Sequence, residues 1–223
     1  MSRHAKLRRL IEIRTGYLSR TGVEETPGAD YRLIQLGDFD ESRAHLRVEN
    51  LVHFDPGDMR KDQTIRPEEV IFLAKGVNNF AYQPGPLPAP TLAASYFYVL
   101  TPSPDILPEY LNWFLNHPHT RRAFDRIAGV GARMPVVKKS DLADIEIPLP
   151  PVADQQKIVC LHALALREAA LLDDLKRTRK AQIDAATMTI AKEVGQAFLP
   201  DHPNEKNCQP GMADILGRET NHA

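Results

Sequence analysis

Two clusters of basic residues are the side chains in this sequence best suited to binding a charged ligand. Residues 1–20 carry six Lys and Arg against one acidic residue, and residues 119–139 also carry six against one. Clusters of this kind can neutralise phosphate groups, although any globular protein has basic faces. The whole chain has 28 basic and 29 acidic side chains and a net charge of −1. This balance argues against a protein that coats nucleic acid without regard to sequence.

A loop after a short apolar segment offers a second group of candidate side chains. Residues 70–74 are apolar and too few for a buried helix, so they predict a buried strand. Lys75, Asn78 and Asn79 follow it. Cationic and amide groups on a loop can reach phosphates and base edges. The same residue types are also common in turns, so the loop alone does not distinguish the two roles.

Motifs of the common catalytic sites are absent from the sequence. It contains no Gly-rich phosphate loop, no His-Glu-x-x-His, no Gly-x-Ser-x-Gly and no Asn-Pro-Pro-Tyr or Asp-Pro-Pro-Tyr of an amino-methyltransferase. Cys160 and Cys208 are too few for a zinc site and are far apart in the sequence. We therefore expect a binding protein that is not an enzyme and binds no cofactor itself.

The elements that position these side chains change in character at residues 145–159. Before this segment, short strands, turns and two short helices (107–116 and 120–128) predict an α+β fold, with a mixed α/β domain over residues 1–150. Within residues 145–159, residues 145–147 predict a short half-buried strand. Pro148, Pro150 and Pro151 are expected to stop strand pairing. Pro151 is expected as the first residue of the helix that follows. Residues 92–100 predict the clearest strand of the domain, because they are aromatic and β-branched.

One long helix is predicted over residues 151–195. Residues 152–194 contain no proline or glycine, and about 40 helical residues span roughly 60 Å. A single apolar stripe requires a partner helix, so we expect a coiled-coil-type helix that dimerises. Glu168 and Arg179 lie near the stripe and make it imperfect. The stripe residues expected in the interface are Leu161, Leu164, Leu171, Leu172, Leu175 and Ile183. Residues 196–223 have little apolar content and predict a disordered tail.

No apolar run reaches the roughly 18 residues that a membrane span requires. The N-terminus is basic but lacks the apolar core of a signal peptide. We therefore expect no membrane association and a cytoplasmic location.

The order of these features resembles the specificity subunits of type I restriction–modification enzymes. The most specific match is Leu142-Ala-Asp-Ile-Glu-Ile-Pro-Leu-Pro-Pro-Val-Ala-Asp-Gln-Gln-Lys-Ile-Val159. Residues 69–76, 92–100, 107–115 and 131–137 match more weakly, but in the expected order. The resemblance covers roughly residues 30–194.

The resemblance implies a target-recognition domain that reads half of a split DNA site, followed by a spacer helix that docks methyltransferase subunits. Catalysis and S-adenosylmethionine would belong to those partners, and a restriction subunit can join such complexes. The chain departs from a full-length member because it has one recognition domain and one spacer instead of two of each. A half-length chain would therefore act as a homodimer on double-stranded DNA with a palindromic split site. A second departure is at Leu73-Ala74-Lys75-Gly76, where many relatives would carry a hydroxyl and an arginine before the glycine.

On this resemblance we expect DNA contacts from the second basic cluster and from the loop after residues 70–74. The candidate residues are Arg133, Arg121, Arg122, Lys138, Lys139, Lys75, Asn78 and Asn79. An alternative is a helical interaction protein, a decoy or inhibitor that occupies a methyltransferase without reading DNA. A third is an enzyme with an unrecognised site, which turnover by the chain alone would reveal.

Overall fold

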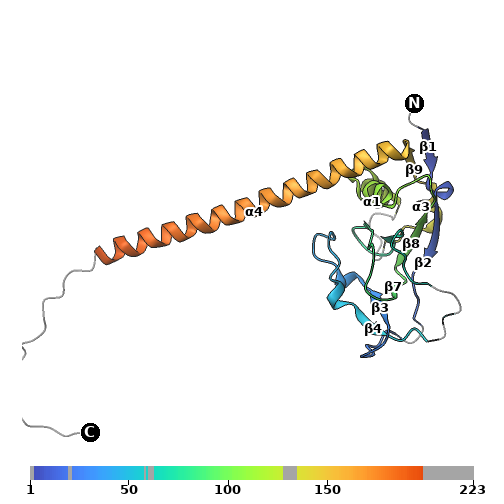
Figure 1. Cartoon of the computed structure of the whole chain (residues 1–223), viewed down its shortest axis with the longest axis horizontal. Coiled ribbons are helices and arrows are strands. Elements are labelled where there is room, and N and C mark those ends of the chain that lie inside the picture. The colour runs from blue at the N-terminus through green and yellow to red at the C-terminus, as the bar shows by residue number, and fades with distance from the viewer. Residues whose placement is uncertain (1–2, 20–21, 58, 60–62, 128–134, 198–223) are drawn as a thin grey trace, which may run out of the picture. The chain divides into compact units, whose positions relative to one another are not determined.

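The computed structural model describes residues 3–19, 22–57, 59, 63–127 and 135–197, of which residue 3 and the last three are described by their backbone alone. Residue contacts divide the chain into two compact units, Met1–Arg167 and Glu168–Ala223, so the boundary falls inside the long helix α4 (Val152–Ala197). The first unit combines sheets with short helices, and α4 is one continuous helix (Figure 1). The predicted α+β class with a long C-terminal helix is confirmed.

The described strands of the first unit form three sheets. The four-stranded sheet is antiparallel and has the order β2 (Ile11–Thr15), β8 (Phe97–Pro102), β5 (Val70–Leu73) and β6 (Ala81–Tyr82). The three-stranded sheet has the order β4 (Val52–Phe54), β3 (Tyr31–Ile34) and β7 (Thr91–Ala93), with β3 and β7 parallel. The third sheet pairs β1 (Arg3–Lys6) with β9 (Glu146–Leu149).

Strand β5 is buried on both faces, which explains its uninterrupted apolar sequence. Val70 and Phe72 belong to a cluster that includes side chains from the helices α1 (Pro108–Asn116), α2 (Pro118–Ile127) and α3 (Lys139–Asp144). Ile71 and Leu73 belong to a second cluster with side chains of the three-stranded sheet. Because successive side chains of a strand point to opposite faces, the four-stranded sheet lies between the helices and the smaller sheet.

Residues 92–100 are not one strand, so that prediction is wrong. They divide between β7 and β8, which belong to different sheets, and the amide of Phe97 donates to the carbonyl of Ala94 in the turn between them (2.9 Å). The chain after β2 passes very close to this turn. A Cβ atom on Gly16 would lie 2.4 Å from the carbonyl oxygens of Ala93 and Ala94, so only glycine fits there.

The structure also corrects two predictions for the proline-containing segment before α4. Strand β9 continues through Pro148, which lies opposite His4 of β1, so this proline does not stop the pairing. In the described sheet β9 has β1 as its single neighbour, and an edge strand tolerates proline. Helix α4 begins at Val152, and the carbonyl of Pro151 accepts the amide of Asp154 (2.8 Å), so Pro151 precedes the helix instead of starting it.

Helix α4 ends at Ala197, two residues beyond the predicted end, and the predicted disordered tail lies outside the described residues from 198 onward. Within the described part of the chain, no helix combines the length and the apolar character that crossing a bilayer demands.

Candidate nucleic-acid interface

The loop after β5 pairs with the segment before α3, and this pairing brings two predicted DNA-contacting residues together. The amide of Gly76 donates to the carbonyl of Pro135, and the amide of Val137 donates to the carbonyl of Ala74, both at 2.9 Å. Lys75 is exposed on this loop, and Lys138 is exposed at the N-terminal cap of α3. Two lysines that are distant in sequence therefore lie on neighbouring backbone segments.

Lys139 is the third lysine of this region, and its ammonium group is held in place. Its Nζ lies 3.4 Å from the carbonyl oxygen of Ile13 and 5.6 Å from the ring centroid of Tyr98. Burial raises the pKa of the Tyr98 hydroxyl, which keeps the ring neutral beneath the cation. Lys139 is thus more constrained than Lys75 or Lys138, although its side chain is exposed.

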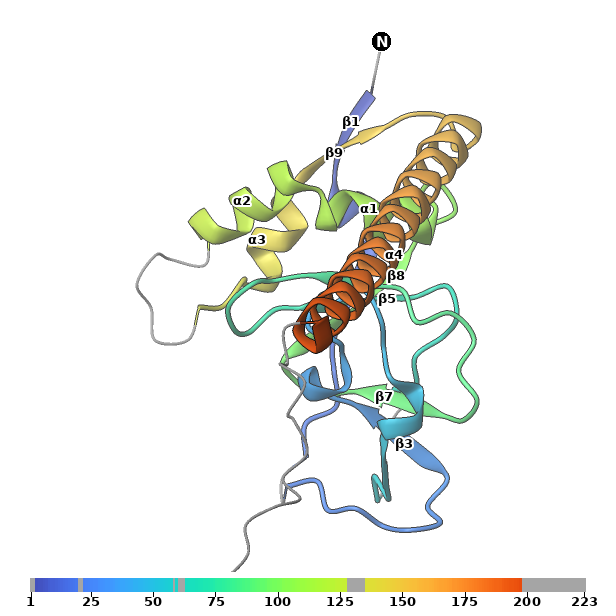
Figure 2. The same ribbon diagram turned by 90° about the vertical axis from the view of Figure 1, so that its left-hand side faces the viewer.

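Helix α2 presents Arg122 and Arg126 on the face opposite the core. Phe124 is fully buried against Phe72 of β5, with 4.9 Å between ring centroids. Arg121 is half-buried, while Arg122 and Arg126 are exposed. Because Phe72 lies shortly before Lys75 in the chain, this packing places α2 beside the strand that leads into the Lys75 loop. Figure 2 shows α2 and α3 at one edge of the first unit.

The predicted DNA contacts at Asn79, Asn78 and Arg133 differ in how the structure places them. Asn79 is 5% exposed, and its Nδ2 donates to the carbonyl of Leu73 at 2.7 Å. Its amide therefore fixes the loop, and this placement does not favour the predicted DNA contact. Asn78 is exposed in a left-handed conformation (φ 60°), and the neighbouring Val77 is an exposed apolar tip that the sequence interpretation missed. Arg133 lies outside the described residues.

Gln155 anchors the beginning of α4 to the first unit, a role that the sequence interpretation also missed. Its side chain is completely buried. Its Oε1 accepts the amide of Leu107 (2.9 Å), and its Nε2 donates to the carbonyls of Asp105 (2.9 Å) and Pro150 (3.0 Å). One side chain thus joins the helix to the chain before α1 and to the proline segment before α4.

We expect Gln155→Ala to lower the free energy of unfolding by about 2 kcal/mol, because three partly buried hydrogen bonds to one amide and two carbonyls are lost. Gln156→Ala is the matched control, since the neighbouring glutamine is exposed. Urea titrations followed by the fluorescence of Trp113, the single tryptophan, would report on the first unit. Equal midpoints for the two variants would contradict the anchoring role of Gln155.

The described residues leave most of α4 without apolar cover. Ile158 and Val159 pack against the core of the first unit. Beyond them, the predicted interface residues are 50–72% exposed: Leu161, Leu164, Leu171, Leu172, Leu175 and Ile183. A row of uncovered leucines at helical spacing is the kind of surface that a second helix covers.

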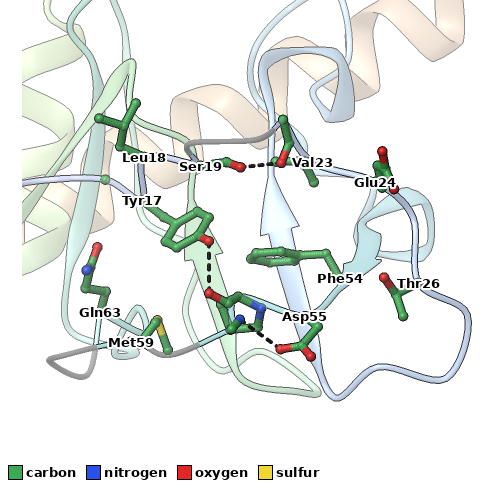
Figure 3. Close-up of a pocket in the computed structure, with 14 residues that line it drawn as sticks. Tyr17, Leu18, Ser19, Val23, Glu24, Thr26, Phe54, Asp55, Met59 and Gln63 are labelled. Carbon is green, nitrogen blue, oxygen red and sulfur yellow. Dashed lines mark hydrogen bonds between the residues drawn. The ribbon is translucent and has the colours of Figure 1, made fainter.

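A cavity of about 840 Å³ lies between the segments that follow β2 and β4. Tyr17 and Phe54 face each other in its wall with ring centroids 5.4 Å apart, and the Tyr17 hydroxyl donates to the carbonyl of Pro56 (Figure 3). The charged side chains among its described lining are Glu24 and Asp55. Carboxylates disfavour phosphate, and none of the predicted DNA contacts lines this cavity, so it is not a candidate DNA site.

Comparison with known proteins identifies the family. Residues 5–185 match the family model described as the type I restriction modification DNA specificity domain. Among curated proteins, no sequence matches.

Two solved structures share the fold. One comes from work on complex assembly and conformational transition of the type I R-M system: it is 18% identical, has a TM-score of 0.55, and the match covers 87% of this chain and 44% of that chain. The HsdS subunit from Thermoanaerobacter tengcongensis is 17% identical with a TM-score of 0.55, and the match covers 77% and 38% of the two chains. The matched region is thus less than half of each relative. Since the family model spans both the sheet-containing unit and most of α4, the chain belongs to the family of type I restriction modification DNA specificity domains.

Proposed function

We propose that this chain is the DNA-specificity subunit of a type I restriction–modification complex. In this proposal the first unit reads one half of a bipartite site in double-stranded DNA, and α4 pairs with a second copy and docks the methyltransferase subunit. The chain itself is not catalytic; S-adenosylmethionine binds the methyltransferase, and a restriction subunit can join. The complex acts in the cytoplasm. The observation that carries the proposal is the family match over residues 5–185, which includes both the reading unit and the helix.

The same observation favours DNA reading over the decoy alternative, because a decoy needs only the helix. The DNA-contacting surface consists of the Lys75 loop, the start of α3 and the outer face of α2. On that surface Lys75, Lys138 and Arg122 are exposed and suited to phosphates. Asn78, at the tip of the anchored loop, is the residue suited to a base edge, since asparagine can pair with adenine through two hydrogen bonds.

Mapping the methylation of DNA from cells that co-express this chain with a candidate methyltransferase tests the function. A palindromic bipartite motif is the expected result, because two identical readers related by a two-fold axis contact identical half-sites. A mobility shift titration with the methyltransferase present gives the opposing outcome. If no DNA sequence is preferred at any salt concentration, the decoy alternative replaces the proposal.

We expect the double variant Arg122→Ala/Lys138→Ala to weaken DNA binding similarly for all sequences. Because both copies of the proposed dimer carry the two substitutions, the loss of four phosphate contacts should also reduce the slope of log K against log salt concentration by about 3.6. Fluorescence anisotropy of the assembled complex on duplex DNA, between about 50 and 200 mM salt, measures both effects. Arg66→Ala is the control, since Arg66 is exposed near the opposite end of β5 from Lys75. An unchanged slope in the double variant would exclude this surface from the phosphate contacts.

A further inference from the structure

The tip of the loop after β5 exposes an apolar side chain between two polar ones. Val77 is 69% exposed, and Lys75 and Asn78 on either side of it are exposed as well. Single exposed apolar residues are common on protein surfaces and need no special explanation. Val77 differs from such residues because it stands beside a cation and an amide on the DNA-contacting surface defined above. A ligand for this tip must therefore offer an apolar group close to polar ones.

Backbone hydrogen bonds to two other segments fix the chain that enters this loop. The amide of Ala74 donates to the carbonyl of Tyr96 at 2.9 Å. The amide of Gly76 donates to the carbonyl of Pro135, as described above. Gly76 has a φ of 122°, a conformation that favours glycine, so the chain bends just before Val77.

The chain that leaves the loop is also fixed. The side-chain amide of Asn79 donates to the carbonyl of Leu73. Asn116 of α1 holds Ala81, since its Nδ2 donates to the Ala81 carbonyl at 2.8 Å and its Oδ1 accepts the Ala81 amide at 3.0 Å. The tip is therefore a short segment between two fixed ends. Because the loop is held before binding, a contact made by its tip costs little ordering of the backbone.

The major groove of DNA offers the combination of groups that this tip would recognise. Of the four bases, thymine alone displays a methyl group there, and apolar side chains pack against it. Adenine displays N7 and N6, which an asparagine can contact with two hydrogen bonds. Neighbouring Cα atoms are about 3.8 Å apart and successive bases about 3.4 Å apart. Two adjacent side chains can therefore reach the same base pair or two successive ones.

We propose that Val77 recognises a thymine of the half-site through its C5 methyl group, beside the adenine that Asn78 contacts. This inference rests on the DNA reading of the proposed function and adds which base the loop tip selects. Lys75, on the same loop, contributes charge toward the phosphates and carries no sequence information. Removal of one buried methyl group should change the dissociation constant about fourfold.

Duplexes that contain deoxyuridine test this inference, because uracil differs from thymine only by lacking the C5 methyl group. Mapping of the methylated motif first identifies the half-site, and each thymine of one half-site is then replaced in turn. At one position the replacement should weaken binding by the assembled complex about fourfold in fluorescence anisotropy. The Val77→Ser variant should bind thymine and uracil equally well at that position, because it lacks the apolar contact.

Leu18→Ser is the matched control for this test. Leu18 is 71% exposed and lines the cavity that is not a candidate DNA site. The control variant should keep the preference of about fourfold for thymine. In co-expressing cells, Val77→Ser should also relax the methylated motif at the same thymine position alone, whereas Leu18→Ser should leave the whole motif unchanged.

Three results would overturn the inference. The first is a half-site whose thymines can all be replaced without loss, or that contains none. The second is a preference for thymine that persists in the Val77→Ser variant. The third is a Val77→Ser variant that keeps this preference but assembles poorly with the methyltransferase in light scattering, because the tip then contacts protein. In each case the methylated motif still supports the proposed function, whereas the absence of any motif removes the proposed function as well.

Discussion

Replacing Glu69 with alanine lowers the free energy of unfolding by about 3 kcal/mol, because three donors in partly buried hydrogen bonds lose one shared acceptor. Glu69 is 2% exposed. Its Oε2 accepts from Nη2 of Arg14 at 2.7 Å and from the amide of Arg66 at 2.9 Å, and its Oε1 accepts from the Thr101 hydroxyl at 2.7 Å. Arg14 also donates to the backbone of residues 63 and 64 at 2.8 Å. Loss of Glu69 thus frees the turn before β5 from β2 and β8. We place the cost at the lower end of the range for broken buried pairs because the Arg14 side chain is 26% exposed and water can solvate it.

Glu68→Ala is the matched control for this prediction, since Glu68 is the same residue type, one position earlier, and is exposed. For a chain of this size the expected loss corresponds to a fall in melting temperature of about 6–12 °C. Trp113 fluorescence or near-ultraviolet circular dichroism should follow the transition, because α4 dominates the far-ultraviolet signal. Equal melting temperatures of the Glu69→Ala and Glu68→Ala variants would show that this cluster does not stabilise the first unit.

Changing Leu171, Leu172 and Leu175 to aspartate is expected to abolish self-association of the chain. Their side chains are 50–61% exposed on α4, and burying one leucine contributes roughly 1.5–3 kcal/mol. In a dimer both copies bury these leucines. Carboxylates at the same positions would repel one another, and they would also repel Asp173 and Asp174 beside them. Multi-angle light scattering should therefore report the mass of one chain, 25.0 kDa for the unmodified sequence, where the parent chain gives twice that mass.

The control for this prediction is Leu166→Asp/Met188→Asp, which places charges on the opposite face of the helix and should leave the dimer intact. Leu172→Ala/Leu175→Ala keeps a strong helix former at both positions and should weaken association without unfolding the helix. Far-ultraviolet circular dichroism checks that the helix persists in each variant. If the triple aspartate variant keeps the mass of a dimer, another surface mediates self-association.

Local sequence patterns were sufficient to predict the two elements that depend on residue spacing and composition alone. The helical spacing of residues 107–116 predicted α1, and the absence of proline and glycine predicted α4. The same approach was wrong for residues 92–100, because both halves of that segment are apolar. What separates them is the amide of Ala94 donating to the carbonyl of Ile34 (3.0 Å), a contact between segments that are distant in the sequence. A local pattern contains no information about such a partner.

The candidate DNA surface shows the same limit. Residue type marked Lys75 and Lys138 as candidate DNA contacts, but their proximity depends on the long-range pairing of Gly76 with Pro135. Asn78 and Asn79 look equivalent in sequence, yet the left-handed backbone at Asn78 turns Asn79 inward. For Gln155 a signal was available. Gln155 lies three positions before Ile158 and four before Val159, on the helix face that packs on the first unit. Gln156 has this spacing to Val159 alone and is exposed.

The pairing of β1 with β9 has a consequence for the order of events during synthesis. Lys6 lies opposite Glu146, so β1 leaves the ribosome long before its partner exists. At about 5–20 residues per second, the roughly 140 residues between them take about 7–28 s to synthesise. Contacts of such high sequence separation form late in folding. The Gln155 anchor and the leucine stripe are translated after β9, so the stripe emerges only when the strands of the first unit are already complete. We therefore expect each nascent chain to complete its first unit before its α4 can contact that of another copy. This order would prevent incomplete chains on one polysome from becoming entangled.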